Sequence, residues 1–273
     1  MAAKEHAFPA GVNVSAATCG GRFSGVHQWP VLGVHRGTSG TAEAPAAAAL
    51  ERKSSGQFAW RFETKSGATR DLQGALWNLE AALCQAIIHS QRRSIAVHAA
   101  VVFGDSRTAL LAGRSGAGKS TLSVALSRRG VVLATDDVTL VEPGMMKLLP
   151  IPRCFHLDDH SVELLEKDGF RFPRQGKRFR FMAPGDPGTG ASLPELLIFL
   201  SASTSEQPRL AAVSQAEMVA RLLSETGRGP LADGETVGVL SRLASRASCY
   251  TLVPGPLSAT ADLLADLIRR ERE

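Results

Sequence analysis

Residues 113–121 have the composition of a loop that holds a polyphosphate. They fit the pattern GxxxxGK[ST] and read Gly113, Arg114, Ser115, Gly116, Ala117, Gly118, Lys119, Ser120 and Thr121. Glycines let the backbone turn tightly enough for successive N–H groups to point at phosphate oxygens. The lysine of such a loop reaches the β and γ phosphates, and the hydroxyl that follows it is a magnesium ligand. We therefore predict that this segment binds a nucleoside triphosphate together with Mg²⁺, with Ser120 as a metal ligand.

The segments on either side of this loop agree with that prediction. Residues 108–112 are a short apolar run typical of a buried strand, and residues 121–129 carry apolar side chains at helical spacing. A helix that starts at the loop directs its positive N-terminal end towards the phosphates. The alternative is a glycine-rich turn that binds no ligand.

An acidic pair follows the next apolar run. Residues 131–135 favour a strand, and Asp136 and Asp137 come directly after it. A carboxylate at this edge of the sheet can hold magnesium directly or through water, and a second one can accept the proton of an attacking hydroxyl. Because neighbouring residues of a strand point to opposite faces, we assign the two acids different roles. Asp137 is the candidate general base and Asp136 the candidate metal residue, whereas two solvated turn acids are the alternative.

His98 is a third candidate for the same site. It lies in the apolar run of residues 94–103, for which we predict the strand that precedes the loop strand. A neutral imidazole at this place could hydrogen-bond the γ phosphate or the Asp137 carboxylate. The alternative is a core histidine whose hydrogen bonds are satisfied within the fold.

From His98 to Asp137 the chain resembles the catalytic domain of bacterial HPr kinase/phosphorylase and its relatives. In that family a histidine on a strand precedes a loop of the form G-x-S-G-x-G-K-S, and a later strand ends in Asp-Asp. The spacings between these elements are similar to those of this sequence. The family's later segment contains a metal-binding glutamate and a nearby arginine, which have no recognisable counterpart in residues 150–160.

The resemblance implies a kinase that transfers the γ phosphate of ATP to a serine hydroxyl of a protein or peptide. It implies that Lys119 and Ser120 bind phosphate and magnesium, and that Asp137 activates the hydroxyl with His98 beside it. Asp137, His98 and Lys119 are then the catalytic residues. HPr kinases are hexamers, so the resemblance also raises the expectation of a homo-oligomer. Two other functions are open: an ATPase or switch protein without a phosphoacceptor, and a kinase of small molecules.

Three further groups of residues lie outside this resemblance. Basic side chains gather in residues 171–180, where they could pair with transferring phosphates or an acidic substrate. A solvated loop anchored by phenylalanines is the alternative. Arg153 is a further candidate cation for the transition state. For the histidines and aspartates of residues 156–160, we favour a helix cap with a polar face over a metal site.

We predict an α/β fold with a P-loop nucleotide-binding core on a mixed sheet, as in HPr kinases and carboxykinases. Residues 1–89 are expected to form a small N-terminal α+β cap with a flexible loop at 37–57, and residues 90–273 the kinase domain. In the cap, alternation over residues 58–62 predicts a strand, and residues 71–89 carry the apolar stripe of a helix.

The rest of the second domain divides into short periodic segments. Strands are predicted at 138–141, 196–200 and 249–253, and helices at 214–223, 236–247 and 258–273. The stretch that follows residue 141, up to about residue 192, is rich in proline and arginine, and we assign no strand there.

The bulk composition argues against several classes of partner. The chain of 273 residues is 44% hydrophobic and 21% charged, which is ordinary for a globular protein. Its net charge of +5 comes without a basic motif that alternates with aromatics, so we expect no nucleic-acid partner. It has no apolar run of about 20 residues and no apolar core near its start, so we expect no membrane partner and a cytoplasmic location. The cysteines are scattered without a CxxC pair, which favours neither zinc nor disulfides.

Overall fold

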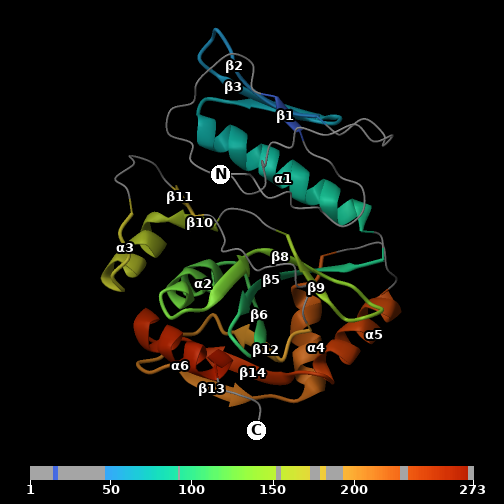
Figure 1. Cartoon of the computed structure of the whole chain (residues 1–273), viewed down its shortest axis with the longest axis vertical. Helices are drawn as coiled ribbons and strands as arrows, with labels where there is room; N and C mark the ends of the chain where they lie inside the picture. Colours follow the sequence, from blue (N-terminus) through green and yellow to red (C-terminus); the bar gives the residue numbers. More distant parts are fainter. Residues whose placement is uncertain are drawn as a thin grey trace. The chain divides into compact units, whose positions relative to one another are not determined.

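The computed structural model describes residues 15–17, 47–91, 93–151, 155–172, 179–182, 193–227 and 233–269. The chain divides into two compact units, Met1–Gln91 and Arg92–Glu273. It is a mixed α/β protein with a mixed sheet and, in these ranges, six helices (Figure 1). None of those helices combines the length and the apolar character that a bilayer span requires.

The first unit is a four-stranded sheet with one helix packed on it. The strands lie in the order β1 (Ser15–Ala17), β2 (Ala47–Arg52), β3 (Phe58–Phe62) and β4 (Lys65–Thr69). The helix α1 (Leu72–Ser90) follows and contacts β3 and β4. Its first turn is capped by Asp71, whose carboxylate accepts a hydrogen bond from the Gly74 N–H at 2.7 Å. The strand predicted at 58–62 and the helix predicted at 71–89 are confirmed as β3 and α1.

The apolar stripe predicted for α1 is the face that the helix buries. Leu76, Leu79, Leu83 and Ile87 are buried, and Leu72 and Ile88 are half-buried. Because these positions recur every three or four residues, they form one side of the helix.

The flexible loop predicted for residues 37–57 is corrected over 47–52, which form β2. Residues 37–46 lie outside the described residues. Alanine has a weak preference for strands, so the alanine run predicted no element. The backbone of β2 instead pairs with β1 on one edge and with β3 on the other, so the pairing with these two strands stabilises it.

The second unit is built on one mixed sheet in the order β13-β14-β12-β6-β5-β8-β9, with β7 also pairing with β5. The bounds are β5 (Ile95–Phe103), β6 (Thr108–Gly113), β7 (Val132–Thr135), β8 (Val138–Val141), β9 (Leu148–Pro150), β12 (Leu196–Leu200), β13 (Arg209–Ala212) and β14 (Ser248–Val253). The strands β6, β12 and β14 are parallel, whereas β5 is antiparallel to β6 and β13 is antiparallel to β14.

The remaining elements of this unit are helices and a separate two-stranded pair. The helices are α2 (Lys119–Ser127), α3 (Asp159–Lys167), α4 (Gln215–Ser224), α5 (Asp233–Ala244) and α6 (Leu257–Arg269), and β10 (Phe155–Asp158) pairs with β11 (Phe179–Met182). The strands and helices predicted from periodicity are confirmed as β5, β6, β7, β8, β12, β14, α2, α4, α5 and α6.

Four strands of the second unit were not predicted: β9, β10, β11 and β13. The first three fall in the proline- and arginine-rich stretch, where only the helix start expected at residues 156–160 is found, as α3. These strands are three or four residues long, too short for a clear period. The residues of β13 are mostly exposed, so this edge strand has no apolar face to reveal it.

Two hydrophobic clusters lie on opposite faces of this sheet. Alternate residues of β6 contribute to different clusters: Leu111 belongs to the cluster under α2 and α6, and Leu110 to the cluster under α4 and α5. Figure 1 shows the two pairs of helices on the two sides of the strands. The second unit is therefore a three-layer arrangement of helices, sheet and helices.

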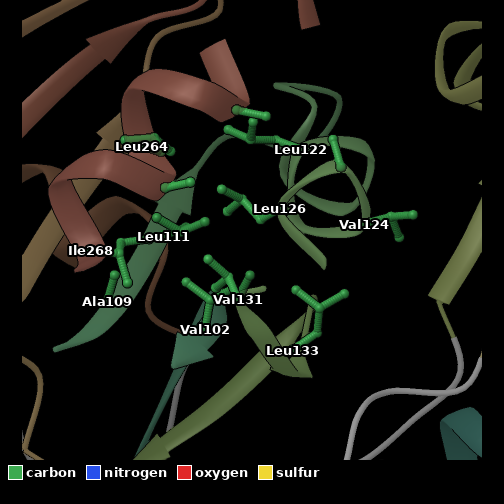
Figure 2. Packing of buried hydrophobic residues seen from close by; sticks show 14 of the residues in the cluster. Val102, Ala109, Leu111, Leu122, Val124, Leu126, Val131, Leu133, Leu264 and Ile268 are labelled. Atoms are coloured by element: carbon green, nitrogen blue, oxygen red, sulfur yellow. The ribbon is translucent and has the colours of Figure 1, made fainter. Parts of the chain in front are cut away.

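The first cluster fixes α2, the helix that begins at the glycine loop. Figure 2 shows Leu122 and Leu126 of α2 and Leu264 and Ile268 of α6 gathered around Leu111 of β6. All five side chains are 3% exposed or less. Burial of each such leucine or isoleucine contributes about 1.5–3 kcal/mol, so the start of α2 is held firmly against the sheet.

Arg129, which follows α2, forms hydrogen bonds with residues of α6 and with the residue that follows α3. Its guanidinium contacts Asp168, after α3, in a two-point pairing at 2.9 and 3.1 Å, and donates to Asp262 of α6 at 2.6 Å. It also donates to the backbone and side-chain oxygens of Ser258. The side chains of Arg129 and Asp168 are 12% and 6% exposed, and the hydrogen bonds from Arg129 lower the pKa of Asp168.

We expect Arg129→Met to lower the free energy of unfolding by about 3 kcal/mol, because it leaves the buried Asp168 without its cation. Urea denaturation measures this change. The matched control is Lys167→Met, since Lys167 pairs with Glu163 where both side chains are more than half exposed, at 68% and 62%. The control should cost less than about 1 kcal/mol. Equal losses in the two variants would contradict the role given to Arg129.

The loss in Arg129→Met should also depend on pH. The pKa of Asp168 is lowered in the folded protein, so its pairing stabilises the fold above the pKa of an unfolded aspartate, about 4. This contribution is lost as the pH falls through the folded pKa. The difference in unfolding free energy between the parent protein and Arg129→Met should therefore shrink below pH about 4, and an unchanged difference there would contradict the assignment.

Candidate functional site

The strand β5 changes its partner on one edge just beyond His98. On that edge β8 pairs with Ile95–His98 and β7 pairs with Val101–Phe103, both antiparallel to β5. Asp136 and Asp137 lie in the break between these two partners. The strand predicted at 138–141 therefore follows the strand predicted at 131–135 along the same edge of β5. The break places the acidic pair next to His98.

The opposite edge of β5 also changes its partner at His98. Beyond this residue β6 is the neighbour, and before it residues 225–227 take the same place. The His98 N–H donates to the Glu225 carbonyl at 2.7 Å, and the Gly227 N–H donates to the Ala96 carbonyl at 3.1 Å. Three segments that are distant in sequence therefore meet around His98.

The loop predicted to bind phosphate joins β6 to α2. Arg114, Ser115 and Gly116 are exposed, and the Ala117 N–H closes a turn by donating to the Arg114 carbonyl at 3.0 Å. Gly118 is the N-cap of α2 with a φ of 90°, in the left-handed region, and provides no side-chain hydrogen bond to the helix. The first N–H groups of α2 are thus left without a side-chain cap, which is the condition under which a helix start receives an anion.

Lys119 is buried inside this loop. The residue is 5% exposed. Its ammonium donates to the Gly113 carbonyl at 2.5 Å and to the Arg114 carbonyl at 3.3 Å. Burial lowers the pKa of Lys119. Negative charges oppose this effect, and in order of size they belong to Glu225, Asp137 and Asp136. The loop thus holds a cation close to three carboxylates, and its hydrogen-bond partners within the described part of the chain are uncharged carbonyl oxygens.

His98 lies between two carboxylates. Its Nε2 is 3.2 Å from Asp137 Oδ1, and its Nδ1 is 3.3 Å from Glu225 Oε2. The side chains of His98 and Asp137 are 32% and 34% exposed, whereas that of Glu225 is 7% exposed. Of the two partners considered for His98 from sequence, the structure brings it to the Asp137 carboxylate.

The two acids of the pair have different environments. Asp136 is buried, at 5% exposed, while Asp137 is partly exposed at the break in the sheet. Ser120 lies half-buried in the first turn of α2. Hydroxyl and carboxylate oxygens are the donors that Mg²⁺ prefers, and such sites are completed by phosphate oxygens and water. The donor chemistry of Ser120 and Asp136 therefore fits magnesium, although the described ranges contain no cluster of three or more His, Cys, Asp or Glu that could hold a metal alone.

Thr121, the last residue of the predicted loop, makes a contact within the fold. Its hydroxyl donates to Ser161 Oγ of α3 at 2.8 Å, and the residue is 8% exposed. Its side chain therefore joins α2 to α3.

The other candidates from sequence make different contacts or lie outside the described residues. Arg153 and residues 173–178 of the basic segment are outside them. Phe172 packs against the first hydrophobic cluster, as the anchored-loop alternative predicts. Asp158 caps α3 by accepting a hydrogen bond from the Ser161 N–H at 2.8 Å, which agrees with the predicted helix cap.

Glu225 is the residue of the cluster that sequence reasoning missed. It lies directly after α4, which was predicted as a helix over residues 214–223, but a single acid at the end of a helix carries no local signal. Its position depends on the hydrogen bonds between residues 225–227 and β5, which join parts of the chain far apart in sequence. Only the assembled sheet reveals it.

Comparisons with known proteins give no match that bears on this cluster. No protein-family model matches the chain, and no curated protein matches it with significant similarity.

We expect Gly113→Ala to lower the free energy of unfolding by about 2 kcal/mol, because Gly113 has a φ of 153° and an added Cβ would lie 2.9 Å from the Leu200 backbone oxygen. Gly227→Ala is the control, since an added Cβ meets no atom within 4 Å there. Urea denaturation compares the two variants. A Gly113→Ala protein as stable as the control would show that the loop start is not packed this closely against β12.

Proposed function

We propose that this protein is an ATP-dependent kinase, similar to HPr kinases, that phosphorylates a serine hydroxyl of a protein or peptide. The proposal depends above all on one observation: a partly exposed carboxylate, Asp137, is paired with His98 and lies near the buried ammonium of Lys119. A cation for the phosphates and a base for the acceptor are thus found in one place. These are the two groups that phosphoryl transfer needs from a protein.

In the proposed reaction the acceptor oxygen attacks the γ phosphorus. The new bond joins that oxygen to phosphorus, and the bond from phosphorus to the oxygen bridging the β and γ phosphates breaks, so ADP leaves with the electron pair. The hydroxyl proton passes to the Asp137 carboxylate. Lys119 stabilises the charge on the phosphate oxygens, and its ammonium exchanges the Gly113 and Arg114 carbonyls for them.

Magnesium would complete this site through Ser120 and Asp136. When bound, it neutralises phosphate charge and helps to orient the γ phosphate. The different exposures of the two acids support separate roles, because the buried Asp136 is poorly placed to meet an incoming substrate and the partly exposed Asp137 is well placed.

We expect Asp137→Asn to lower kcat for phosphoryl transfer by about a hundred- to ten-thousand-fold while ATP binding changes little, because the amide cannot accept the hydroxyl proton. Transfer is measured with γ-labelled ATP, Mg²⁺ and a library of serine peptides, with the products identified by mass spectrometry. ATP affinity is measured separately by calorimetry.

Asp266→Asn is the matched control, since Asp266 is an exposed acid on α6 that pairs with Arg269. This control should retain the parent rate. Full transfer by Asp137→Asn would remove the proposed base. ATP hydrolysis by the parent protein without any phosphorylated acceptor would instead favour an ATPase or switch protein.

A further inference from the structure

The position of His98 between two carboxylates raises a problem of proton placement. A neutral imidazole has a single N–H, and it therefore donates to one carboxylate and presents a lone pair to the other. The candidates are Glu225 at Nδ1 and Asp137 at Nε2, at nearly equal distances of 3.3 and 3.2 Å. Distance alone does not choose between them.

Burial does distinguish the two carboxylates. The Glu225 side chain is 7% exposed, whereas that of Asp137 is 34% exposed. A buried carboxylate without a donor loses more free energy than one that water can reach. Donation of the single N–H to Glu225 therefore stabilises the protein more than donation to Asp137. This favours the proton on Nδ1.

Glu225 is also held rigidly enough to direct the ring. Its own carbonyl accepts the His98 N–H at 2.7 Å, so the two residues are joined through backbone and side chain alike. The Ser224 hydroxyl lies 3.3 Å from the other carboxylate oxygen of Glu225, although its single proton has a shorter acceptor in the Arg221 carbonyl at 2.6 Å. The contacts between Glu225 and His98 themselves therefore hold the carboxylate beside the ring.

We infer that Glu225 is a positioning residue, which keeps the proton of His98 on Nδ1 so that Nε2 presents its lone pair to Asp137. Its chemical meaning rests on the proposed function. When Asp137 has taken the proton of the acceptor hydroxyl, its O–H bond can break in favour of a new bond to Nε2. The imidazolium that results lies between two carboxylates and is stabilised by both.

The inference predicts a spectroscopic signature that requires neither nucleotide nor acceptor. Long-range ¹H–¹⁵N correlation spectra distinguish protonated from unprotonated ring nitrogens and are recorded at a pH where the ring is neutral. The His98 signals are assigned by their loss in His98→Gln. We expect the parent protein to carry the proton on Nδ1.

Two variants should then behave in opposite ways. Glu225→Met keeps the side-chain length but removes the acceptor, so the proton should move to Nε2, facing Asp137. Asp137→Ala removes the other acceptor and should leave the proton on Nδ1. Glu217→Met is the matched control on α4, where Glu217 pairs with Arg221 on the surface, and it should leave the spectrum unchanged.

A proton that stays on Nδ1 in Glu225→Met, or one that leaves Nδ1 in Asp137→Ala, would overturn the inference. Circular dichroism and urea denaturation check that each variant is folded. Should Glu225→Met fail to fold, the parent protein and Asp137→Ala still decide the matter, because a proton found on Nε2 in the parent contradicts it directly.

Kinetics separate this inference from the proposed function. If the protein is a kinase, Glu225→Met should lower kcat by about ten- to a hundred-fold with little change in KM for ATP, as expected when the partner that orients a histidine is lost. If the parent protein transfers no phosphoryl group, the proposed function is contradicted, but the assignment of the His98 proton is unaffected. Transfer with an unchanged kcat in Glu225→Met would overturn the positioning role and leave the kinase proposal intact.

Discussion

The hydrogen bonding of β5 around His98 determines where the candidate site forms. At this residue β6 gives way to residues 225–227 on one edge, and β8 gives way to β7 on the other. Where the partner changes, one strand ends and another segment begins, and both changes lie at the same level of the sheet. Glu225 and Asp137 are thereby brought to opposite sides of one imidazole. The chemistry at this point is a consequence of strand pairing as much as of side-chain identity.

The positive charge of Lys119 is stabilised by nearby carboxylates that are not its hydrogen-bond partners. Lys119 is bonded to backbone carbonyls, and its burial works against its charge, while three nearby carboxylates favour it. An arrangement of this kind keeps the ammonium available, because carbonyl oxygens are weaker partners than a phosphate. The same burial limits the water that competes with an incoming anion.

Much of the second unit could be predicted because its elements carry their own signals. The loop at 113–121 combines glycines and a lysine at defined spacing, and the apolar runs beside it match β6 and α2. His98 and Asp137 were predicted because they lie in or directly after strands predicted close to that loop in the sequence. The structure places His98 Nε2 3.2 Å from Asp137 Oδ1. Asp136 and Asp137 do have different surroundings, but they lie in the bend between β7 and β8 and not within a strand, so the alternation used to predict this does not explain it.

The parts that escaped prediction depend on strand pairing or are too short to show a pattern. The alanine run of β2 has little strand preference, and only its pairing with β1 and β3 makes it a strand. Short segments such as β9 and β10 lack the length to show a period. Glu225 belongs to the same category, because neither α4 nor the residues after it indicate that their carbonyl groups will meet β5.

The pairing of residues 225–227 with β5 has a further consequence for the synthesis of the chain. The glycine loop and the acidic pair leave the ribosome before this segment has been made. Until it arrives, the Ala96 carbonyl and the His98 N–H are on an open strand edge, the kind of surface that templates association with other chains. A product of premature termination would therefore carry the complete loop sequence and still tend to aggregate, with Lys119 lacking its largest source of negative charge.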